Sequence, residues 1–353
     1  MRLGTFHKKK RLLINKIKIN FLSFLFSHKG VKLLPANSIK SCLLIHDNSK
    51  LGDLIVLSAL YRALAERGIK LSIISCGIGH AFLKANPGIS HFFIKDSNSI
   101  SEVLKLRREL AKHQFDVVLD PFETQPSFGH ALLLSGLRHH YILGFDKWYK
   151  RYYSSYHPHD EQLTEHMATR TRVICEHLFG EGVQYDERYD LPLPTDVEQQ
   201  LQEFVGDTKV VIVNPIGAKK ICRMSNHQIE LIDSWLKENH PELRIIYTGH
   251  PKDLPLIPVK NIETLPFKDF IHAVALTKYC QYVISVDTAL VHIASAYDRP
   301  TLAFYPKARR EDYPSPIIWA PNNLRAQQVI SPTCSACDIE ETVLLDALKR
   351  LFH

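Results

Sequence analysis

Residues 282–305 have the sequence YVISVDTALVHIASAYDRPTLAFY, and this stretch decides the fold class. The apolar, partly β-branched run at 282–286 predicts a strand, and the spacing of apolar residues over 288–296 predicts a helix. A second β-rich run follows at 301–305, after a short turn that contains a proline. A strand, a helix and a strand with connections this short indicate parallel strands and a helix that packs on their sheet.

The same alternation extends along most of the chain. Further strands are predicted at 42–47, 71–75, 92–95, 115–120, 210–214 and 244–248. Further helices are predicted at 53–67, 101–113, 165–179, 226–237, 268–277 and 339–351. The regular alternation lapses over residues 141–156, which are rich in aromatic and basic side chains, and a polar stretch with two prolines at 189–195 separates the two series.

The pattern therefore predicts an α/β protein with two Rossmann-like domains that face a central cleft. We expect a basic leader at residues 1–35, an N-terminal domain at 36–190 and a C-terminal domain at 191–353, with the last helix packed across the cleft. The length of 353 residues fits two domains, and 45% apolar with 23% charged residues is typical of soluble globular proteins. Seven scattered cysteines favour free thiols in a reducing compartment.

Positive charge is concentrated in the leader. Residues 1–46 contain ten basic residues and no acidic one, so a net charge of +7 for the whole chain leaves the remainder at −3. The apolar run at 17–26 is much shorter than the roughly 20 residues that span a bilayer, and no cleavage site follows it. We expect this segment to lie on an anionic inner leaflet. The alternatives are a helix docked on its own domain, with a solvated lysine face, and a groove for an anionic acceptor.

The first stretch whose residues could bind a ligand or catalyse a reaction is 48–53, NSKLGD, between a predicted strand and its helix. Gly52 permits a tight turn, and the N-terminus of the helix offers backbone N–H groups to an anion or a polar substrate. Asp53 stands where the helix begins, so it is either a functional carboxylate or a helix cap. The strand is not followed by a GxGxxG fingerprint, which argues against a dinucleotide-dependent oxidoreductase.

The second stretch is residues 214–225, NPIGAKKICRMS. A predicted strand ends in a glycine turn, and three cations, Lys219, Lys220 and Arg223, precede a helix that Ser225 can cap. Cations on a loop beside a helix N-terminus suit a pyrophosphate group. The alternative is a solvated basic loop without a ligand.

The third stretch is residues 284–292, ISVDTALVH, in which a strand runs directly into a helix. Asp287 and Thr288 stand at the joint, where the hydroxyl of Thr288 and the first backbone amides can hold phosphate oxygens. His292 follows four residues after Thr288, over the same helix face. A lone histidine on a helix is more often structural, but its place beside this joint favours a functional role.

Several other classes of site are not supported by the sequence. Cys334 and Cys337 form a CxxC pair, but neither a second pair nor a nearby pair of histidines completes a zinc site, which leaves only a distant cysteine as a further ligand. No DxD triplet, nucleophile elbow or Walker loop is present. The body is mildly acidic and its aromatic residues do not alternate with basic ones, so nucleic acid is not an expected partner.

Together the three stretches resemble glycosyltransferase family 9, the ADP-heptose:lipopolysaccharide heptosyltransferases. The Leu-Gly-Asp turn of that family resembles residues 51–53, and its central Pro-Gly-Ala loop with Lys or Arg resembles residues 215–223. Its Ser-x-Asp-Thr-Gly-x-x-His signature, the most specific of the three, resembles residues 285–292. The likeness extends over residues 40–330. It implies a GT-B fold, an inverting reaction and neither a metal nor a cofactor beyond the donor substrate ADP-heptose.

The resemblance also implies roles for individual residues. Asp53 would be the general base that deprotonates the acceptor hydroxyl. Arg223, with Lys219 or Lys220, would neutralise the departing nucleotide diphosphate, and Thr288 would hold the same phosphates. The other residues implied are Asp287, Ala289 and His292 in the donor pocket and Ser49, Lys50 and Gly52 in a loop on the acceptor side.

Two departures from the family pattern leave the donor sugar open. Ala289 replaces the usual glycine, and the basic loop has the sequence KICRMS instead of the common Lys-Arg-Trp-Pro. Residues 1–10, 120–124 and 149–153 further resemble members that act on the lipopolysaccharide outer core. We therefore expect a cytoplasmic enzyme, peripheral at the inner membrane, that adds heptose to this acceptor. The alternatives are an N-acetylglucosaminyl or hexosyl transferase that uses a UDP-sugar, and a binding module for the core oligosaccharide.

Overall fold

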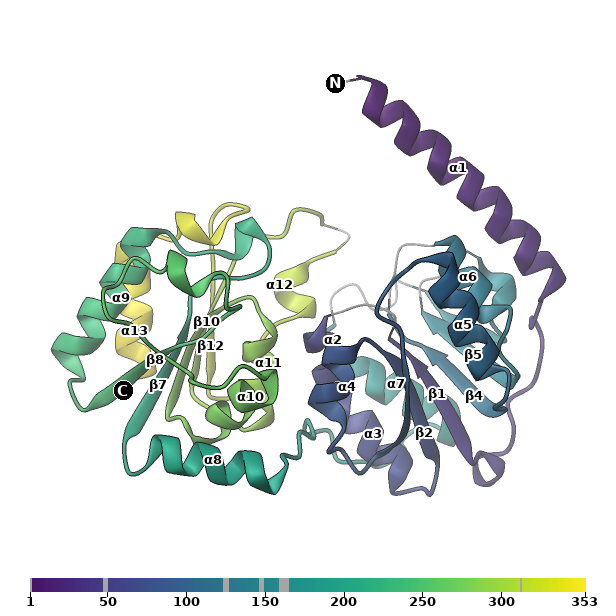
Figure 1. The fold of residues 1–353 in the computed structure, drawn as a ribbon, viewed down its shortest axis with the longest axis horizontal. Helices are drawn as coiled ribbons and strands as arrows, with labels where there is room; N and C mark the ends of the chain where they lie inside the picture. Colours follow the sequence, from purple (N-terminus) through teal and green to yellow (C-terminus); the bar gives the residue numbers. More distant parts are fainter. Residues whose placement is uncertain (1, 47–49, 123–126, 146–148, 159–164, 312) are drawn as a thin grey trace. The chain divides into compact units, whose positions relative to one another are not determined.

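The structure, a computed structural model, describes residues 2–46, 50–122, 127–145, 149–158, 165–311 and 313–353 (Figure 1). The chain forms two compact units, each built from several segments. The first unit comprises Met1–Ser49, Leu60–Gln162 and Arg170–Asp186, and the second comprises Lys50–Ala59, Leu163–Thr169 and Glu187–His353. Neither unit is therefore a continuous piece of the sequence.

The first unit contains a six-stranded, all-parallel sheet in the order β3-β2-β1-β4-β5-β6. Its strands are β1 (Ser41–Ile45), β2 (Lys70–Ser75), β3 (Ile89–Ile94), β4 (Phe115–Asp120), β5 (His139–Phe145) and β6 (Ser155–His157). The order 3-2-1-4-5-6 is that of a Rossmann fold, in which the chain reverses direction across the sheet between the first and fourth strands.

Helices accompany this sheet in the pattern that parallel strands require. They are α1 (Arg2–Leu25), α3 (Ser58–Ala65), α4 (Gly77–Leu83), α5 (Ile100–Leu110), α6 (Phe128–Leu134) and α7 (Thr169–Phe179). The core of the unit joins apolar side chains of the strands to those of α5 and α6, and it includes Ile19 of α1, which is completely buried. The helix α1 is thus docked on the unit through its C-terminal half.

The second unit repeats the same topology. Its six parallel strands have the order β12-β11-β10-β7-β8-β9. When β7 is counted as the first strand and the sheet is followed from β9 to β12, the order is again 3-2-1-4-5-6. The strands are β7 (Lys209–Asn214), β8 (Leu243–Tyr247), β9 (Glu263–Thr264), β10 (Tyr282–Val286), β11 (Thr301–Tyr305) and β12 (Ala326–Ile330). The sequence-based prediction of two parallel α/β halves is confirmed.

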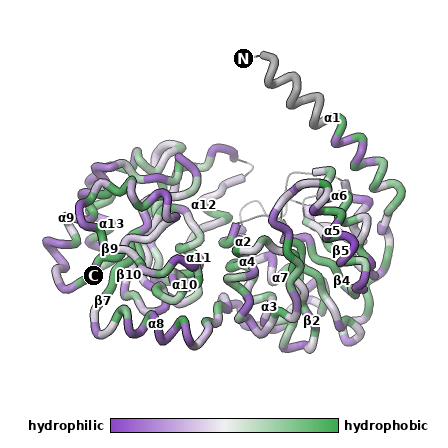
Figure 2. The backbone as a smooth tube through the Cα atoms, in the orientation of Figure 1, coloured by the Kyte–Doolittle hydropathy of each residue, from purple (hydrophilic) through white to green (hydrophobic). Residues whose placement is uncertain are grey.

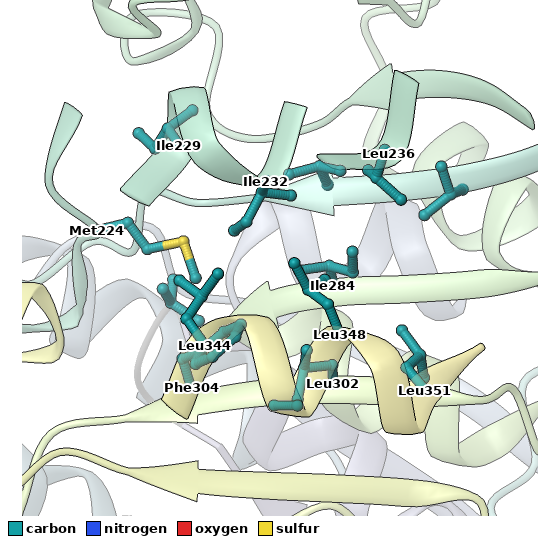
Figure 3. Close-up of a cluster of buried hydrophobic side chains, with 14 of the residues drawn as sticks. Met224, Ile229, Ile232, Leu236, Ile284, Leu302, Phe304, Leu344, Leu348 and Leu351 are labelled. Carbon is teal, nitrogen blue, oxygen red and sulfur yellow. The ribbon is translucent and has the colours of Figure 1, made fainter. Parts of the chain in front are cut away.

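The helices of this unit are α2 (Leu51–Val56), α8 (Thr195–Val205), α9 (Asn226–Asn239), α10 (Phe270–Tyr279), α11 (Ala289–Ala296), α12 (Ser315–Ile318) and α13 (Glu341–Leu351). Figure 3 shows side chains of α9 and α13 meeting over β10 and β11, with Ile232 and Leu348 among the residues that face Ile284. A capping box at the start of α9, formed by Ser225 and Gln228, fixes where that helix begins.

The predicted fold differs from the structure in several details, and the strands β9 and β12 and the helix α8 were not predicted. The helix predicted over 53–67 is two helices, because the hydroxyl of Ser58 donates to the carbonyl of Ile55 at 2.7 Å and competes with the helical backbone pattern there. No strand was predicted over 141–156, yet β5 ends in this segment and the short edge strand β6 lies in it, with the 3-10 helix Lys150–Tyr152 between them. The last helix, α13, packs on the sheet of its own unit, against β11, β12 and α9.

Candidate functional site

The carboxyl ends of β7 and β10 lie side by side in the second sheet, where the strand order reverses. In sheets of this kind the connections from these two strands run in opposite directions, which leaves room for a ligand between them. The segments that follow β7 and β10 are the second and third stretches singled out in the sequence. The fold therefore brings these two stretches together at one edge of the sheet.

The hydroxyl group of Thr288, at the joint between β10 and α11, makes as many hydrogen bonds as it can. As the N-cap of α11, its Oγ1 accepts from Leu290 N–H at 3.3 Å and from Asn214 Nδ2 at 3.3 Å. Ser285 Oγ donates to the carbonyl of Val286 at 2.8 Å, so the hydroxyl of Thr288 donates to Ser285 Oγ at 3.1 Å. With its hydrogen and both lone pairs engaged, the hydroxyl of Thr288 fixes the start of α11, where the positive end of the helix dipole favours an anion.

The loop after β7 folds back on itself as a small hairpin. Ile216 and Arg223 form an antiparallel bridge, and Gly217 N–H donates to the carbonyl of Cys222 at 2.7 Å. A Cβ atom at Gly217 would lie 2.5 Å from that carbonyl oxygen, so no larger residue fits this turn without opening the hairpin. The glycine thus sets the positions of Lys219 and Lys220 at the tip of the loop.

The three cations of this loop have different surroundings. Lys219 and Lys220 are exposed. Arg223 is one-third exposed; its Nε donates to the carbonyl of Gly217 at 3.1 Å and its Nη2 lies 3.5 Å from Asp253 Oδ1. The guanidinium group therefore stabilises the hairpin from one side, while the two lysines remain accessible to an anionic ligand.

Asp287 lies against the same loop. The thiol of Cys222 donates to Asp287 Oδ2 at 3.7 Å. Burial raises the pKa of Asp287, while Lys219, Cys222 and Lys50 act in the opposite direction. Burial also raises the pKa of the Cys222 thiol to about 12, and the nearby carboxylate of Asp287 adds to this shift. Cys222 is therefore a protonated hydrogen-bond donor to Asp287 at neutral pH.

The first stretch belongs to the second unit as well, because α2 packs against α11. A Cβ at Gly52 would lie 3.3 Å from His292 Cδ2 and 3.8 Å from Ala289 Cα, so a glycine at this position permits the close approach of the two helices. Asp53 is only 5% exposed and lies in the first turn of α2, where the helix dipole favours a carboxylate. The N-cap of α2 is Lys50, so Asp53 does not occupy the capping position that the alternative interpretation gave it.

His292 is a neutral, buried imidazole. It is 3% exposed, and burial lowers its pKa to about 3, with a smaller contribution from His166. Its ring makes edge-to-face contacts with His166 and Trp319. His166 donates from Nε2 to the carbonyl of Ala320 at 2.8 Å and accepts at Nδ1 from Ala168 N–H. Among the described residues nothing bonds to His292 Nδ1.

Comparison with known proteins assigns the chain to a family. Residues 103–345 match the model of glycosyltransferase family 9 (heptosyltransferase). The chain is also 56% identical, over 99% of its length and 98% of the relative's, to a protein of Escherichia coli (strain K12) named "Putative lipopolysaccharide heptosyltransferase 4". The chain belongs to glycosyltransferase family 9. It is accordingly a glycosyltransferase.

Three solved structures share its fold. A glycosyltransferase of the family from Veillonella parvula superposes with a TM-score of 0.73 at 17% identity, over 91% of this chain and 98% of the other. The E. coli ADP-heptose lipopolysaccharide heptosyltransferase II gives a TM-score of 0.67 at 18% identity, over 88% and 98%. The E. coli heptosyltransferase WaaC with ADP gives 0.66 at 17% identity, over 88% and 99%. The predicted GT-B class, with two Rossmann-like units, is confirmed.

Most residues implied by the family 9 resemblance lie together in the second unit. Lys50, Gly52 and Asp53 are on or next to α2, and the donor-side residues Lys219, Arg223, Asp287, Thr288, Ala289 and His292 lie on the hairpin and on the start of α11. Lys220 is at the tip of the same hairpin. Ser49 lies outside the described residues. The functional roles of all these residues remain predictions.

The family 9 motifs did not reveal every polar residue at this edge. Asn214, Thr248 and His166 lie beside the predicted residues, and Arg309, after β11, is close enough to influence the pKa of Cys222. Counting the register from the predicted strands would have placed Asn214 next to Ser285. No local pattern marks His166, because its contact with α11 depends on the tertiary fold.

The first unit has a separate buried polar cluster at the carboxyl end of β4. Asp120 is 1% exposed; it is bonded to His130 Nε2 at 2.9 Å and accepts from the hydroxyl of Tyr153 at 2.5 Å. Burial raises the pKa of Tyr153, and Asp120 adds to this effect. All three residues are buried, so the cluster fastens β4, α6 and the 149–153 turn to one another. Of the stretch 120–124 that resembles outer-core enzymes, residues 123 and 124 are not described.

The cysteines are all described, and all seven are free thiols. Cys334 and Cys337, the CxxC pair of the sequence, are exposed, and the thiol of Cys337 lies 3.0 Å from Ser335 Oγ. Within the described part of the chain, no group of three or more His, Cys, Asp or Glu residues is placed to hold a metal ion.

Proposed function

We propose that this protein transfers a heptose from ADP-heptose to the lipopolysaccharide outer core with inversion at the anomeric carbon. The observation that carries the proposal is the packing of α2 on α11, which brings the buried carboxylate of Asp53 into the unit that holds the basic hairpin. The name of the E. coli relative supports the same reaction class. We assign the nucleotide sugar to residues 191–353 and the acceptor to the side of residues 36–190. No metal or cofactor takes part in the proposed reaction.

The donor diphosphate binds between the hairpin and the start of α11. The backbone N–H groups at the helix N-terminus and the exposed ammonium groups of Lys219 and Lys220 supply positive charge. Arg223 adds charge and holds the hairpin through Gly217. Asp287 and the neutral His292 shape the donor pocket on the side of α2.

Asp53 acts on the acceptor. Its carboxylate takes the proton from the acceptor hydroxyl as that oxygen forms a bond to the anomeric carbon of the heptose. The bond from this carbon to the phosphate oxygen breaks on the opposite face, and its electron pair leaves with ADP. The cations of the hairpin stabilise the charge that develops on the departing diphosphate. Lys50, at the N-cap of α2, and Gly52, in the first turn of that helix, belong to the acceptor side in this proposal.

The decisive test is the mass of the product. Purified protein is incubated with a truncated core lipopolysaccharide and either ADP-heptose or UDP-N-acetylglucosamine. An increment of one heptose supports the proposal. An increment of one N-acetylhexosamine contradicts it and indicates that Ala289 and the KICRMS loop accommodate a different donor. If neither donor gives a product, the protein is a binding module or uses another acceptor, and the proposed reaction is wrong.

We also propose that α1 holds the enzyme at the cytoplasmic surface of the inner membrane. None of the helices formed by described residues is long and apolar enough to cross a membrane. One face of α1 is docked through Ile19 and Ser23, which are 0% and 4% exposed. The opposite face carries exposed apolar residues. Its members are Leu13, Ile14, Ile17, Phe21, Phe24 and Leu25, each between 42% and 68% exposed. Figure 2 shows hydrophobic and hydrophilic residues alternating along the coloured part of α1.

The exposed face fits an anionic lipid surface because it combines two features. Its residues recur every three or four positions, so they form one stripe along the helix. Lys16 and Lys18 are exposed beside the stripe, and the preceding residues 1–12 carry five more basic residues and no acidic one. Apolar side chains flanked by cations are typical of helices that lie in the interface of anionic bilayers.

Replacing Ile17 and Phe21 together by glutamine should weaken binding to phosphatidylglycerol vesicles at least about tenfold, because two apolar side chains no longer enter the lipid. Sedimentation with vesicles measures the effect. Deleting α1 is a poorer test, since it would also remove Ile19 from the core. The matched control is the double change Ile78→Gln and Ile317→Gln, at residues that are 59% and 47% exposed elsewhere. If the control weakens vesicle binding and the α1 variant does not, α1 is not the membrane contact.

A further inference from the structure

A row of polar residues crosses the second sheet at its carboxyl edge. Asn214 of β7 is in register with Ser285 of β10. On its other side, Val213 pairs with Tyr247 and Thr248 N–H donates to the carbonyl of Val213 at 3.0 Å, which places Thr248 next to Asn214. Side chains in register on neighbouring strands lie on the same face of a sheet. Thr248, Asn214 and Ser285 therefore form one continuous row.

Within the part of the chain that the structure describes, two polar atoms of this row lack partners. Ser285 and Thr288 bond to each other, and the Nδ2 group of Asn214 donates to Thr288 at 3.3 Å. The remaining polar atoms, Asn214 Oδ1 and Thr248 Oγ1, are buried and have no hydrogen-bond partner in the described part of the protein. Their residues are only 7% and 8% exposed. Buried polar atoms are rarely left unpaired, so a group from outside the chain is expected to bond to them.

The neighbouring backbone leaves room beside these atoms. Gly249 follows Thr248, and a Cβ atom at Gly249 would lie 3.7 Å from Asn214 Oδ1. The φ angle of +159° at this residue is one that side-chain-bearing residues rarely adopt. A glycine at this position therefore keeps a side chain away from Asn214 Oδ1.

The hydrogen-bonding capacities of Asn214 Oδ1 and Thr248 Oγ1 determine which ligand group can bond to both. Asn214 Oδ1 can only accept a hydrogen bond, whereas the hydroxyl of Thr248 can donate one. An ionised phosphate oxygen carries no hydrogen, so it cannot bond to Asn214 Oδ1. A hydroxyl group satisfies both atoms, since it donates to Asn214 and accepts from Thr248.

We propose that Asn214 Oδ1 and Thr248 Oγ1 together bind one hydroxyl group of the nucleotide-sugar donor. The inference rests on the proposed function, because a nucleotide sugar supplies phosphates for the start of α11 and hydroxyls for the adjoining row. Thr288 links the two subsites, since it caps α11 and accepts from Asn214. The hydroxyl belongs either to the ribose or to the transferred sugar, and one titration series separates these sources.

The test replaces Thr248 by valine, which has the same shape but no hydroxyl. Calorimetric titration should show ADP-heptose binding about threefold to tenfold more weakly to this variant than to the unmodified protein. Thr248→Ser, which restores the hydroxyl, should recover most of the affinity. The matched control is Thr301→Val, at a fully buried residue on β11 of the same sheet, whose hydroxyl donates to the carbonyl of Arg299. We expect wild-type affinity for the control.

Titration with ADP alone identifies the source of the hydroxyl. If Thr248→Val binds ADP and ADP-heptose more weakly by the same factor, the hydroxyl belongs to the ribose. If only its affinity for ADP-heptose falls, the hydroxyl belongs to the transferred sugar. Both results support the proposal. Unchanged affinity for both, with a lower melting temperature for Thr248→Val, means that the row holds a buried water and overturns it. If the unmodified protein binds UDP-N-acetylglucosamine and not ADP-heptose, the heptose proposal fails. The same variants are then titrated with UDP-N-acetylglucosamine, where unchanged affinity overturns the hydroxyl site.

Discussion

Replacing Asp53 by asparagine should lower kcat by about 10²- to 10⁴-fold, the usual contribution of a general base, and leave ADP affinity nearly unchanged. The expectation follows from the proposed role of the carboxylate, which removes a proton from the acceptor and does not touch the nucleotide. Asparagine keeps the size of the side chain at this 5% exposed position but cannot take a proton. Single-turnover assays with saturating donor and acceptor, together with calorimetric titration of ADP, measure the two quantities.

A helix-stabilising role for Asp53 predicts a different result. In that case the variant would lose some thermal stability and keep its turnover, because a carboxylate in the first turn of a helix contributes about 0.3–1 kcal/mol. Asp196→Asn is the matched control, since Asp196 is an exposed carboxylate in the first turn of α8 in the same unit. Wild-type turnover in both variants would remove Asp53 from the reaction.

Replacing Arg223 by alanine should weaken ADP binding by about 1.5–3 kcal/mol, the typical worth of a hydrogen bond to a charged group. Two effects contribute to this loss. The variant lacks one positive charge beside the phosphates, and the hairpin loses the bond from Arg223 Nε to the carbonyl of Gly217. Arg223→Lys should retain part of the affinity, because a lysine keeps the charge but not the planar group that reaches both Gly217 and Asp253.

The control for Arg223 is Arg325→Ala. Arg325 is exposed just before the amino end of β12, at the opposite edge of the sheet from the hairpin, and its guanidinium donates to the carbonyl of Asp298. Its loss changes the net charge of the protein by the same amount, so unchanged ADP affinity in this control excludes a general electrostatic effect. If Arg223→Ala also binds ADP with wild-type affinity, the phosphate contact belongs to Lys219 or Lys220.

Local sequence patterns predicted four of the six strands of the second unit closely, but they missed the edge strands β9 and β12 and the helix α8. The strands expected at 210–214 and 301–305 are β7 and β11 to within one residue, because buried parallel strands are short apolar runs bounded by turns. The patterns were less successful in the first unit, where the short edge strand β6 has no fully buried residue and leaves little signal. Ser58 likewise divides a helix through a side-chain bond that periodicity does not reveal.

The site was predicted in its parts but not in its assembly. The three stretches could be identified because each follows the end of a strand, where ligands bind in sheets of this type. The contact of Gly52 with His292 could not, since it joins positions far apart in the sequence and depends on how the helices pack. The buried Oδ1 of Asn214 and Oγ1 of Thr248, which have no partner among the described residues, depend on the pairing of three strands and have no local sequence signal.

The assignment of α2 to the second unit has a consequence for the engineering of chimeric enzymes. Segments Lys50–Ala59 and Leu163–Thr169 belong to the second unit although they precede it in the sequence. A chimera that joins two family members at residue 190 would set the α2 of one parent against the α11 of the other. At Gly52 a Cβ atom would lie 3.3 Å from His292 Cδ2, so a larger residue there would have to displace the imidazole ring. The exchangeable module is therefore discontinuous, and a graft of the donor half should include both short segments.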